Sequence, residues 1–174
     1  FPASPYCTNA QGHGPAWANS LFEDFCEFGL GMKVGSDRAR ATVAKFMEQG
    51  LSCTCCTDEM KALFTKWLEN RNDAKATREV ADALVPLMEN CGCDTCKALL
   101  EYKHFIPARS QWIIGGDGAS YDIGFGGLDH VLASGENVNI LVLDTEVYSN
   151  TGGQSSKSTP VGAIAKFAAS GKKI

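Results

Sequence analysis

Two short apolar segments constrain the fold of this chain more than any other feature. Residues 111–115 have the pattern of a short buried strand, and the apolar run within residues 139–144 shows no alternation, which is typical of strands in a parallel sheet that is covered on both faces. A glycine-rich turn and a helix-like run near 124–134 separate the two segments, as the crossover of a βαβ unit requires. A polar loop over 145–160 and a helix near 161–170 are expected to follow. The sequence therefore predicts an α/β fold that contains a parallel βαβ unit.

The N-terminal region, residues 1–35, is rich in glycine, proline and aromatic side chains. Pro15 suits the first position of a helix and Gly29 its end, and apolar residues recur between them at helical spacing. This apolar stripe consists of Trp17, Leu21, Phe25 and Phe28. We predict a helix over residues 15–29 with its aromatic side chains in the core, preceded by an ordered loop over residues 4–14.

The middle of the chain, residues 36–110, has the composition of helices. Alanine, lysine, glutamate and leucine are frequent there and β-branched runs are few. The expected helices lie near 37–49, 58–70, 75–90 and 95–103. Pro86 should end or kink the third of them. We predict a helical insertion between the N-terminal region and the βαβ unit.

Length and charge exclude several classes of protein. The 174 residues correspond to about one domain, and the net charge of −4 is unlike that of a non-specific nucleic-acid binder. No apolar run reaches the roughly 18 residues of a membrane-spanning helix. The chain starts at Phe1 without a basic and apolar leader and stops after a helix-like run, so we expect a fragment of a longer protein. Its compartment cannot be inferred from such an N-terminus.

Two polar loops follow the two predicted strands. The first contains Gly116-Asp117-Gly118 and the second runs over 144–154. Ligands of open parallel sheets bind beyond the carboxyl ends of strands, so Asp117 and Thr145 face one ligand if the strands are neighbours. Glycines let backbone N–H groups approach phosphate, and a carboxylate beside phosphate makes sense when Mg²⁺ lies between them. The residues indicate an Mg²⁺-bridged diphosphate site, although Gly-Asp-Gly alone is also a common turn.

Three longer stretches resemble the pyruvate:ferredoxin (flavodoxin) oxidoreductases, in their thiamine-diphosphate-binding domain. They are GHGPAWANSLFED at 12–24, GDGASYDIGFGGLDHVL at 116–132 and DTEVYSNTGGQSSK at 144–157. The resemblance is close over 1–32 and 111–172 and weak across the helical insertion. It implies that residues 1–174 are a fragment of one thiamine-diphosphate-binding domain. Its parts would be a cofactor-side loop and helix at 1–35, the helical insertion at 36–110 and an Mg²⁺–diphosphate βαβ unit at 111–174.

The resemblance also implies a set of metal ligands. Asp117 would be the carboxylate ligand of Mg²⁺, Thr145 would contribute its side-chain oxygen and Val147 its backbone carbonyl. Many thiamine enzymes have asparagine where this chain has Thr145, and either residue presents a neutral oxygen.

Further cofactor contacts follow from the same resemblance. Gly116 and Gly118 would approach the diphosphate. Asn150 would lie beside the reactive thiazolium and the substrate, as the one catalytic residue of this segment, and Phe22 would pack near the cofactor. The pair Ala119-Ser120 departs from the family, which often has Trp-Ala there, and this leaves the ligands intact.

The resembled enzymes oxidatively decarboxylate pyruvate with coenzyme A to acetyl-CoA and CO₂. Their electrons pass through [4Fe–4S] clusters to ferredoxin or flavodoxin. The resemblance implies that this segment holds Mg²⁺ and thiamine diphosphate, that other domains of the same polypeptide hold the clusters, and that the enzyme is a homodimer without nucleic-acid or membrane partners. The parent enzyme would be cytoplasmic or lie in a hydrogenosome- or mitochondrion-type organelle, and the fragment alone would be inactive. A pyruvate:NADP⁺ oxidoreductase or another thiamine-diphosphate enzyme is the alternative.

Six of the eight cysteines fall into two groups within the helical insertion. They are Cys53, Cys55, Cys56, Cys91, Cys93 and Cys96. Such groups can hold zinc or an iron–sulfur cluster, and a cysteine-rich metal-binding module is the non-enzymatic alternative. We interpret the spacing as irregular rather than as two Cys-x₂-Cys pairs, and none of the cysteines matches a cluster ligand of the resembled family. We therefore expect reduced thiols or local disulfides.

Overall fold

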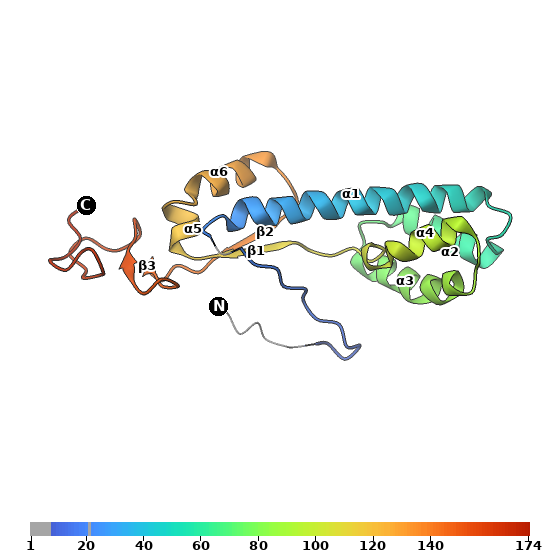
Figure 1. Cartoon of the computed structure of the whole chain (residues 1–174), viewed down its shortest axis with the longest axis horizontal. Coiled ribbons are helices and arrows are strands. Elements are labelled where there is room, and N and C mark those ends of the chain that lie inside the picture. Colours follow the sequence, from blue (N-terminus) through green and yellow to red (C-terminus); the bar gives the residue numbers. More distant parts are fainter. Residues whose placement is uncertain (1–7, 21) are drawn as a thin grey trace. The chain divides into compact units, whose positions relative to one another are not determined.

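The computed structural model describes residues 8–20 and 22–174. The chain divides into two compact units, which we call the sheet unit (residues 1–31 and 111–174) and the helical unit (residues 32–110). Figure 1 shows the elements of both. The long helix α1 (Phe25–Ser52) contributes its first turns to the sheet unit and the rest to the helical unit.

The sheet unit is built on the predicted βαβ arrangement. Strand β1 (Trp112–Gly115) pairs in parallel with β2 (Asn139–Val142), in a register that runs from Trp112 opposite Asn139 to Gly115 opposite Val142. The crossover contains α5 (Asp117–Tyr121) and α6 (Phe125–Ser134). Helix α6 ends at Gly135, whose φ of 68° places it in the left-handed region that glycine favours. The prediction of a parallel pair with a helix near 124–134 is confirmed.

Strand β2 differs from the prediction in its burial. Its residues are exposed or half-buried, and Leu141 is 43% exposed, so the strand is not covered on both faces within this chain. Strand β1 buries Ile113, which packs with Cys26 and Val131 in the small core of the sheet unit.

The predicted helix over 15–29 is wrong at both ends. Residues 13–20 have no regular structure, and α1 begins only at Phe25 and continues through Gly29. A side chain at Gly29 would place its Cβ 2.3 Å from Cγ1 of Ile113, so this glycine allows α1 to pack closely on β1 and does not end a helix.

The predicted apolar stripe is buried only in part. Phe25 and Phe28 are half-buried and not fully in the core, and Trp17 is 50% exposed because its segment is not helical. Leu21 lies outside the described residues. Beyond this region, the predicted helix at 37–49 is the second half of α1.

The C-terminal part of the sheet unit also differs from expectation. The loop over 145–160 contains an antiparallel hairpin of β3 (Val147–Tyr148) and β4 (Gln154–Ser155). The predicted helix near 161–170 is absent, and turns with isolated bridges replace it. Lys172 explains this course, because its ammonium donates to the carbonyls of Ser156, Lys157 and Thr159 at 2.9, 2.6 and 2.7 Å and ties the chain end to the loop.

The helices of the helical unit lie close to their predicted positions. They are α2 (Asp58–Glu69), α3 (Ala74–Glu89), α4 (Asp94–Glu101) and the short 3₁₀ helix η1 (Lys103–Phe105). Thr57 and Asp73 cap α2 and α3 by accepting hydrogen bonds from Met60 N and Ala76 N. Pro86 does not end α3 at once, since the helix continues through it to Glu89.

A single apolar core holds the helical unit together. Its fully buried large side chains include Met47, Met60, Phe64, Trp67 and Leu84, which come from α1, α2 and α3. Cys56 and Cys96 belong to the same core. Among the described residues, no helix has both the length and the apolar character needed to cross a membrane.

Candidate functional site

A buried carboxylate lies at the end of β1. Asp117 is the first residue of α5 and is only 2% exposed. Its Oδ1 accepts hydrogen bonds from the backbone N–H and the hydroxyl of Thr145, both at 2.9 Å, and its Oδ2 accepts one from the hydroxyl of Ser158. Burying a carboxylate is costly unless donors surround it, and these three groups meet that need.

Asp117 carries its charge at neutral pH. Burial on its own raises the pKa of this carboxyl, but the hydrogen bonds from Ser158 and Thr145 outweigh burial and lower the pKa below its ordinary value. All three donors are neutral groups, so they orient the negative charge without cancelling it. The surroundings of Asp117 therefore suit a cation.

The three oxygens predicted as Mg²⁺ ligands lie together. Oδ1 of Asp117 is 2.9 Å from Oγ1 of Thr145, and that hydroxyl is 3.0 Å from the backbone oxygen of Val147. A carboxylate, a hydroxyl and a carbonyl are hard oxygen donors, the type that Mg²⁺ prefers. The donor set therefore fits the expected metal, and one small ion could contact all three oxygens.

A strained turn orients the Val147 carbonyl. Glu146 has φ 61°, in the left-handed region that non-glycine residues seldom adopt. Its N–H donates to Oδ1 of Asp144 at 3.1 Å, and its carbonyl accepts a hydrogen bond from the hydroxyl of Thr159. These bonds hold the turn that places the carbonyl of Val147 beside Thr145.

The two predicted diphosphate glycines have different surroundings. A Cβ at Gly116 would meet only the Leu143 carbonyl oxygen, at 4.0 Å, so the space beside this residue is open. A Cβ at Gly118 would lie 2.4 Å from the ring of Tyr148 and 2.7 Å from Cδ of Glu23. Gly118 thus permits close packing of α5 against β3 and the segment before α1. Contact of either glycine with diphosphate stays a prediction.

Asn150 and Phe22 are linked through Glu23. The amide of Asn150 donates to Oε1 of Glu23 at 3.3 Å, which joins the loop after β2 to the segment that carries Phe22. Phe22 is 75% exposed, so its ring is accessible. The sheet unit thus brings segments near residues 22, 117 and 150 of the chain to one region.

Sequence reasoning missed three residues of this region. Ser158 donates to Asp117, Tyr148 packs on Gly118, and Glu23 binds Asn150. Ser158 lies 41 residues from Asp117, and Glu23 lies 127 residues from Asn150. Nothing in the local sequence could have paired them.

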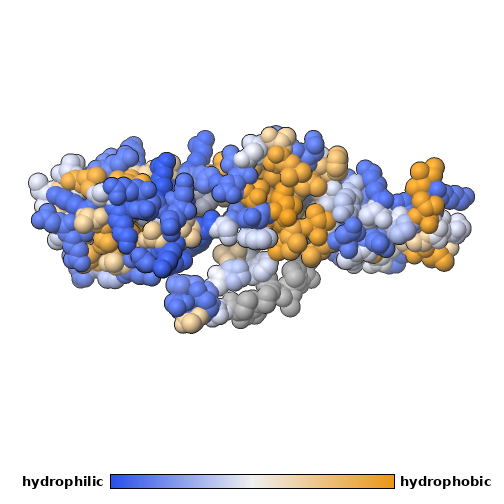
Figure 2. Space-filling view, turned by 180° about the vertical axis from the view of Figure 1, so that it is seen from behind, coloured by the Kyte–Doolittle hydropathy of each residue, from blue (hydrophilic) through white to orange (hydrophobic). Residues whose placement is uncertain are grey.

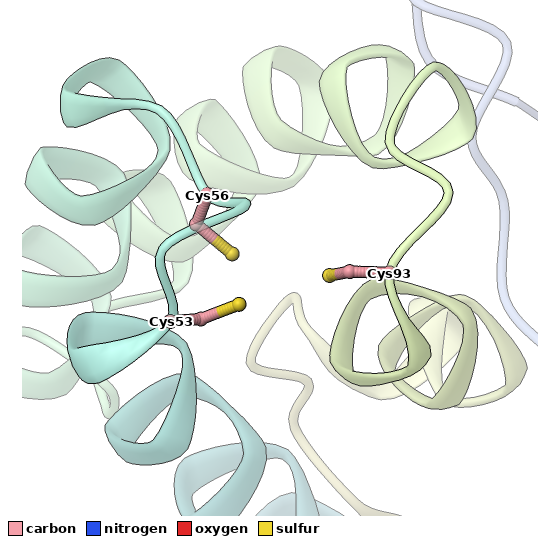
Figure 3. A group of neighbouring side chains, drawn as sticks. All are labelled: Cys53, Cys56 and Cys93. Atoms are coloured by element: carbon pink, nitrogen blue, oxygen red, sulfur yellow. The ribbon is translucent and has the colours of Figure 1, made fainter.

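The structure also gathers the cysteines of the helical unit. The Sγ atoms of Cys53, Cys56 and Cys93 all lie within 4.8 Å of one another, and Figure 3 shows their sulfur atoms pointing toward a common centre. A second group, in which all Sγ atoms also lie within 4.8 Å of one another, consists of Cys91, Cys93 and Cys96. No disulfide joins the cysteines of the described region, whose thiols are free.

Burial changes the chemistry of two of these thiols. It raises the pKa of Cys56 to about 12 and also raises the pKa of Cys96, so both are protonated at neutral pH when no cation is near. The interpretation of the spacing as irregular was wrong. Cys53-Thr54-Cys55-Cys56 and Cys93-Asp94-Thr95-Cys96 are each a Cys-x₂-Cys pair, and the additional Cys55 and Cys91 obscured them.

Comparison with known proteins gives a consistent set of relatives, although no protein-family model matches the chain. The chain is 57% identical over 174 residues to the pyruvate-flavodoxin oxidoreductase of Klebsiella pneumoniae, a match that covers 99% of this chain and 15% of the relative. It is 52% identical over 182 residues to the pyruvate:ferredoxin oxidoreductase of Moorella thermoacetica, covering 98% of this chain and 15% of the relative. A mitochondrial pyruvate dehydrogenase [NADP(+)] of Euglena gracilis is 46% identical over 180 residues, which are 98% of this chain and 10% of that protein.

These matches extend through the helical unit. Since they cover 98–99% of the chain, residues 36–110 are aligned as well. The chain spans only about 15% of the length of the first two relatives.

Proposed function

Because the chain is homologous over nearly its whole length to a segment of the pyruvate:ferredoxin and pyruvate-flavodoxin oxidoreductases, we propose that it is the Mg²⁺- and thiamine-diphosphate-binding segment of such an enzyme. The whole protein would oxidatively decarboxylate pyruvate with coenzyme A to acetyl-CoA and CO₂. Electrons would pass through [4Fe–4S] clusters held elsewhere in the polypeptide to ferredoxin or flavodoxin. The observation that carries the proposal is the cluster of oxygens from Asp117, Thr145 and Val147 after two neighbouring parallel strands.

Each residue of the oxygen cluster has a distinct task in this proposal. Asp117 supplies the negative charge. Thr145 and Val147 supply neutral oxygens, which complete the set of Mg²⁺ ligands that this segment of the protein contributes. The open space at Gly116 leaves room for the diphosphate to reach the same ion. Thiamine diphosphate, when bound, supplies the electron-accepting ring that decarboxylation of a 2-oxo acid requires.

Asn150 and Phe22 would act at the other end of the cofactor. The hydrogen bond to Glu23 restricts the orientation of the Asn150 amide, which leaves its carbonyl oxygen free to face the ring and the substrate. The exposed ring of Phe22 is available for packing against the cofactor.

Exposed apolar side chains support a place for this segment within a larger assembly. On the sheet unit, the large exposed residues include Ile123, Phe125, Leu132, Leu141 and Leu143. Figure 2 shows apolar surface gathered on this part of the chain. Apolar patches of this kind commonly mark contacts with other protein surfaces. We propose that other domains of the same polypeptide, or the second copy in a homodimer, cover them.

A pyruvate:NADP⁺ oxidoreductase is the second candidate. The Euglena relative, a pyruvate dehydrogenase [NADP(+)], is 46% identical to this chain across the same residues. The oxygen cluster would serve either enzyme equally, because both would use it to hold the cofactor and not the final electron acceptor.

A substitution of Thr145 tests the proposed function. Thr145→Val keeps the shape of the side chain and removes one oxygen ligand, so the affinity of the intact protein for thiamine diphosphate with Mg²⁺ should fall by roughly 10- to 100-fold, the cost of one lost polar partner. Thr145→Ser keeps the hydroxyl and should remain within about threefold of the natural protein. Isothermal titration calorimetry measures both, and equal affinities for the valine and serine variants would contradict the assignment.

A further inference from the structure

Two Cys-x₂-Cys pairs meet inside the helical unit, although helices α2 and α3 separate them in sequence. From this arrangement we infer that Cys53, Cys56, Cys93 and Cys96 form a structural Zn²⁺ site with four thiolate ligands. Paired Cys-x₂-Cys sequences at the ends of short structural elements are typical of structural zinc sites. The site lies in a unit separate from the oxygen cluster around Asp117, so its presence does not depend on the proposed function.

The sulfur positions match a single ion. With Zn–S bonds of about 2.3 Å, tetrahedral geometry places neighbouring sulfurs about 3.8 Å apart. The Sγ atoms of Cys56 and Cys96 are 3.9 Å apart, and those of Cys53, Cys56 and Cys93 lie within 4.8 Å of one another. Cys93 belongs to both cysteine groups and so connects the two pairs. Small rotations of these side chains would bring all four sulfurs to one centre.

The backbone holds the four ligands on well-defined elements. Cys53 directly follows α1, and Cys56 precedes the capped start of α2. Cys93 is the N-cap of α4 and Cys96 lies in its first turn, where its N–H donates to Sγ of Cys93 at 3.4 Å. An N–H bond to sulfur stabilises a thiolate and orients it, as the outer hydrogen bonds of metal sites commonly do.

Burial indicates a closed, structural site. Cys56 and Cys96 are buried in the core of the helical unit, and Cys53 and Cys93 are half-buried. Four protein ligands without an open position are typical of structural zinc, whereas catalytic zinc keeps a place for water. Such an ion would join the end of α1 to the starts of α2 and α4.

A mononuclear ion fits better than an iron–sulfur cluster. In a [4Fe–4S] cluster each thiolate binds a different iron, so the four sulfurs lie farther apart than ligands of one ion. Here the Sγ atoms of Cys56 and Cys96 are 3.9 Å apart, and that of Cys93 lies within 4.8 Å of those of Cys53, Cys56 and Cys96. Tetrahedral four-sulfur sites otherwise select zinc.

The test is the metal content of the intact protein, purified with reductant and without chelator. Elemental analysis should find about one zinc per chain, and replacing Cys56 and Cys93 together with serine should remove at least about nine-tenths of it while the iron content stays unchanged. Cys55→Ser is the matched control, because Cys55 lies between two ligands but outside both sulfur groups, and it should keep its zinc. Cys91→Ser should keep it as well.

A second measurement does not depend on the variants folding. Removing zinc from the natural protein with a chelator should lower its melting temperature, and adding Zn²⁺ should restore it. Co²⁺ added instead should give the absorption of a tetrahedral tetrathiolate ion. Zinc at background level, iron lost with the cysteines, or disulfides between these residues in the reduced protein would each overturn the proposal. Loss of zinc in Cys91→Ser but not in Cys53→Ser would overturn the ligand set.

Discussion

Replacing Asp117 with alanine should abolish the binding of thiamine diphosphate with Mg²⁺ to the intact protein, and pyruvate oxidation with it. The change removes the buried negative charge of the oxygen cluster and leaves the backbone N–H of Thr145 without its acceptor. Loss of one partner from a buried charge pair costs about 3–5 kcal/mol, which corresponds to at least a hundredfold loss of affinity. Calorimetric titration measures the affinity, and enzymatic assay with pyruvate and coenzyme A measures the activity.

Two further variants separate this effect from a general loss of charge or fold. Asp117→Asn keeps the size of the side chain but removes the charge, so it should lose affinity nearly as far as alanine does. Asp129→Asn makes the same change at an exposed position of α6 and should bind normally. If Asp117→Ala binds the cofactor as the natural protein does, Asp117 is not the carboxylate ligand.

The lowered pKa of Asp117 adds an expectation for pH. A carboxylate whose pKa is depressed on folding stabilises the native state above its unfolded pKa of about 3.9, and this contribution is lost as the pH falls through the lower, folded value. Asp117 should therefore remain ionised as the pH falls from neutrality toward this lower, folded pKa. Over that range its protonation should not weaken Mg²⁺ binding.

The largest expected loss of stability comes from replacing Trp67 with alanine. Trp67 is fully buried, its indole N–H donates to the carbonyl of Ile106 at 2.7 Å, and the guanidinium of Arg40 lies 5.2 Å from the ring centre. Large-to-small changes of this kind cost about 3–5 kcal/mol, a large share of the 5–15 kcal/mol that stabilises a typical domain. Hydrogen exchange of the intact protein should show faster exchange throughout α2, α3 and α4.

Matched variants define the origin of this loss. Trp67→Phe retains most of the buried ring but not the donor, so it should cost about 1–3 kcal/mol, less than alanine. Trp112→Ala removes the same side chain at a position that is 56% exposed and should leave exchange in the helical unit unchanged. Native-like exchange in Trp67→Ala would show that the helical unit does not depend on this core.

Local patterns predicted much of the fold. The apolar runs that became β1 and β2 predicted a parallel pair, and composition placed α2, α3 and α4 within a few residues of their observed bounds. These elements follow from interactions between residues that are close in sequence. The Gly-Asp-Gly turn after one strand and Thr145 after the next likewise predicted that their oxygens meet.

Other features depend on contacts that local sequence does not show. Gly29 has the character of a helix end, yet it lies inside α1 because Ile113 occupies the space of its missing side chain. The C-terminal residues have a helical pattern, yet Lys172 binds the carbonyls of a loop 13 to 16 residues earlier. The cysteine pairs were visible as Cys-x₂-Cys sequences, but only folding brings Cys56 and Cys96 together.

The most direct test of the central proposal is a crystal structure of the intact protein with thiamine diphosphate and Mn²⁺ in place of Mg²⁺. Both ions accept carboxylate and carbonyl oxygens, and the anomalous scattering of manganese locates the ion independently of its surroundings. The expected result is one anomalous peak within bonding distance of the Asp117 carboxylate, the Thr145 hydroxyl, the Val147 carbonyl and the diphosphate. A peak beside the diphosphate that contacts none of these three residues would contradict the account.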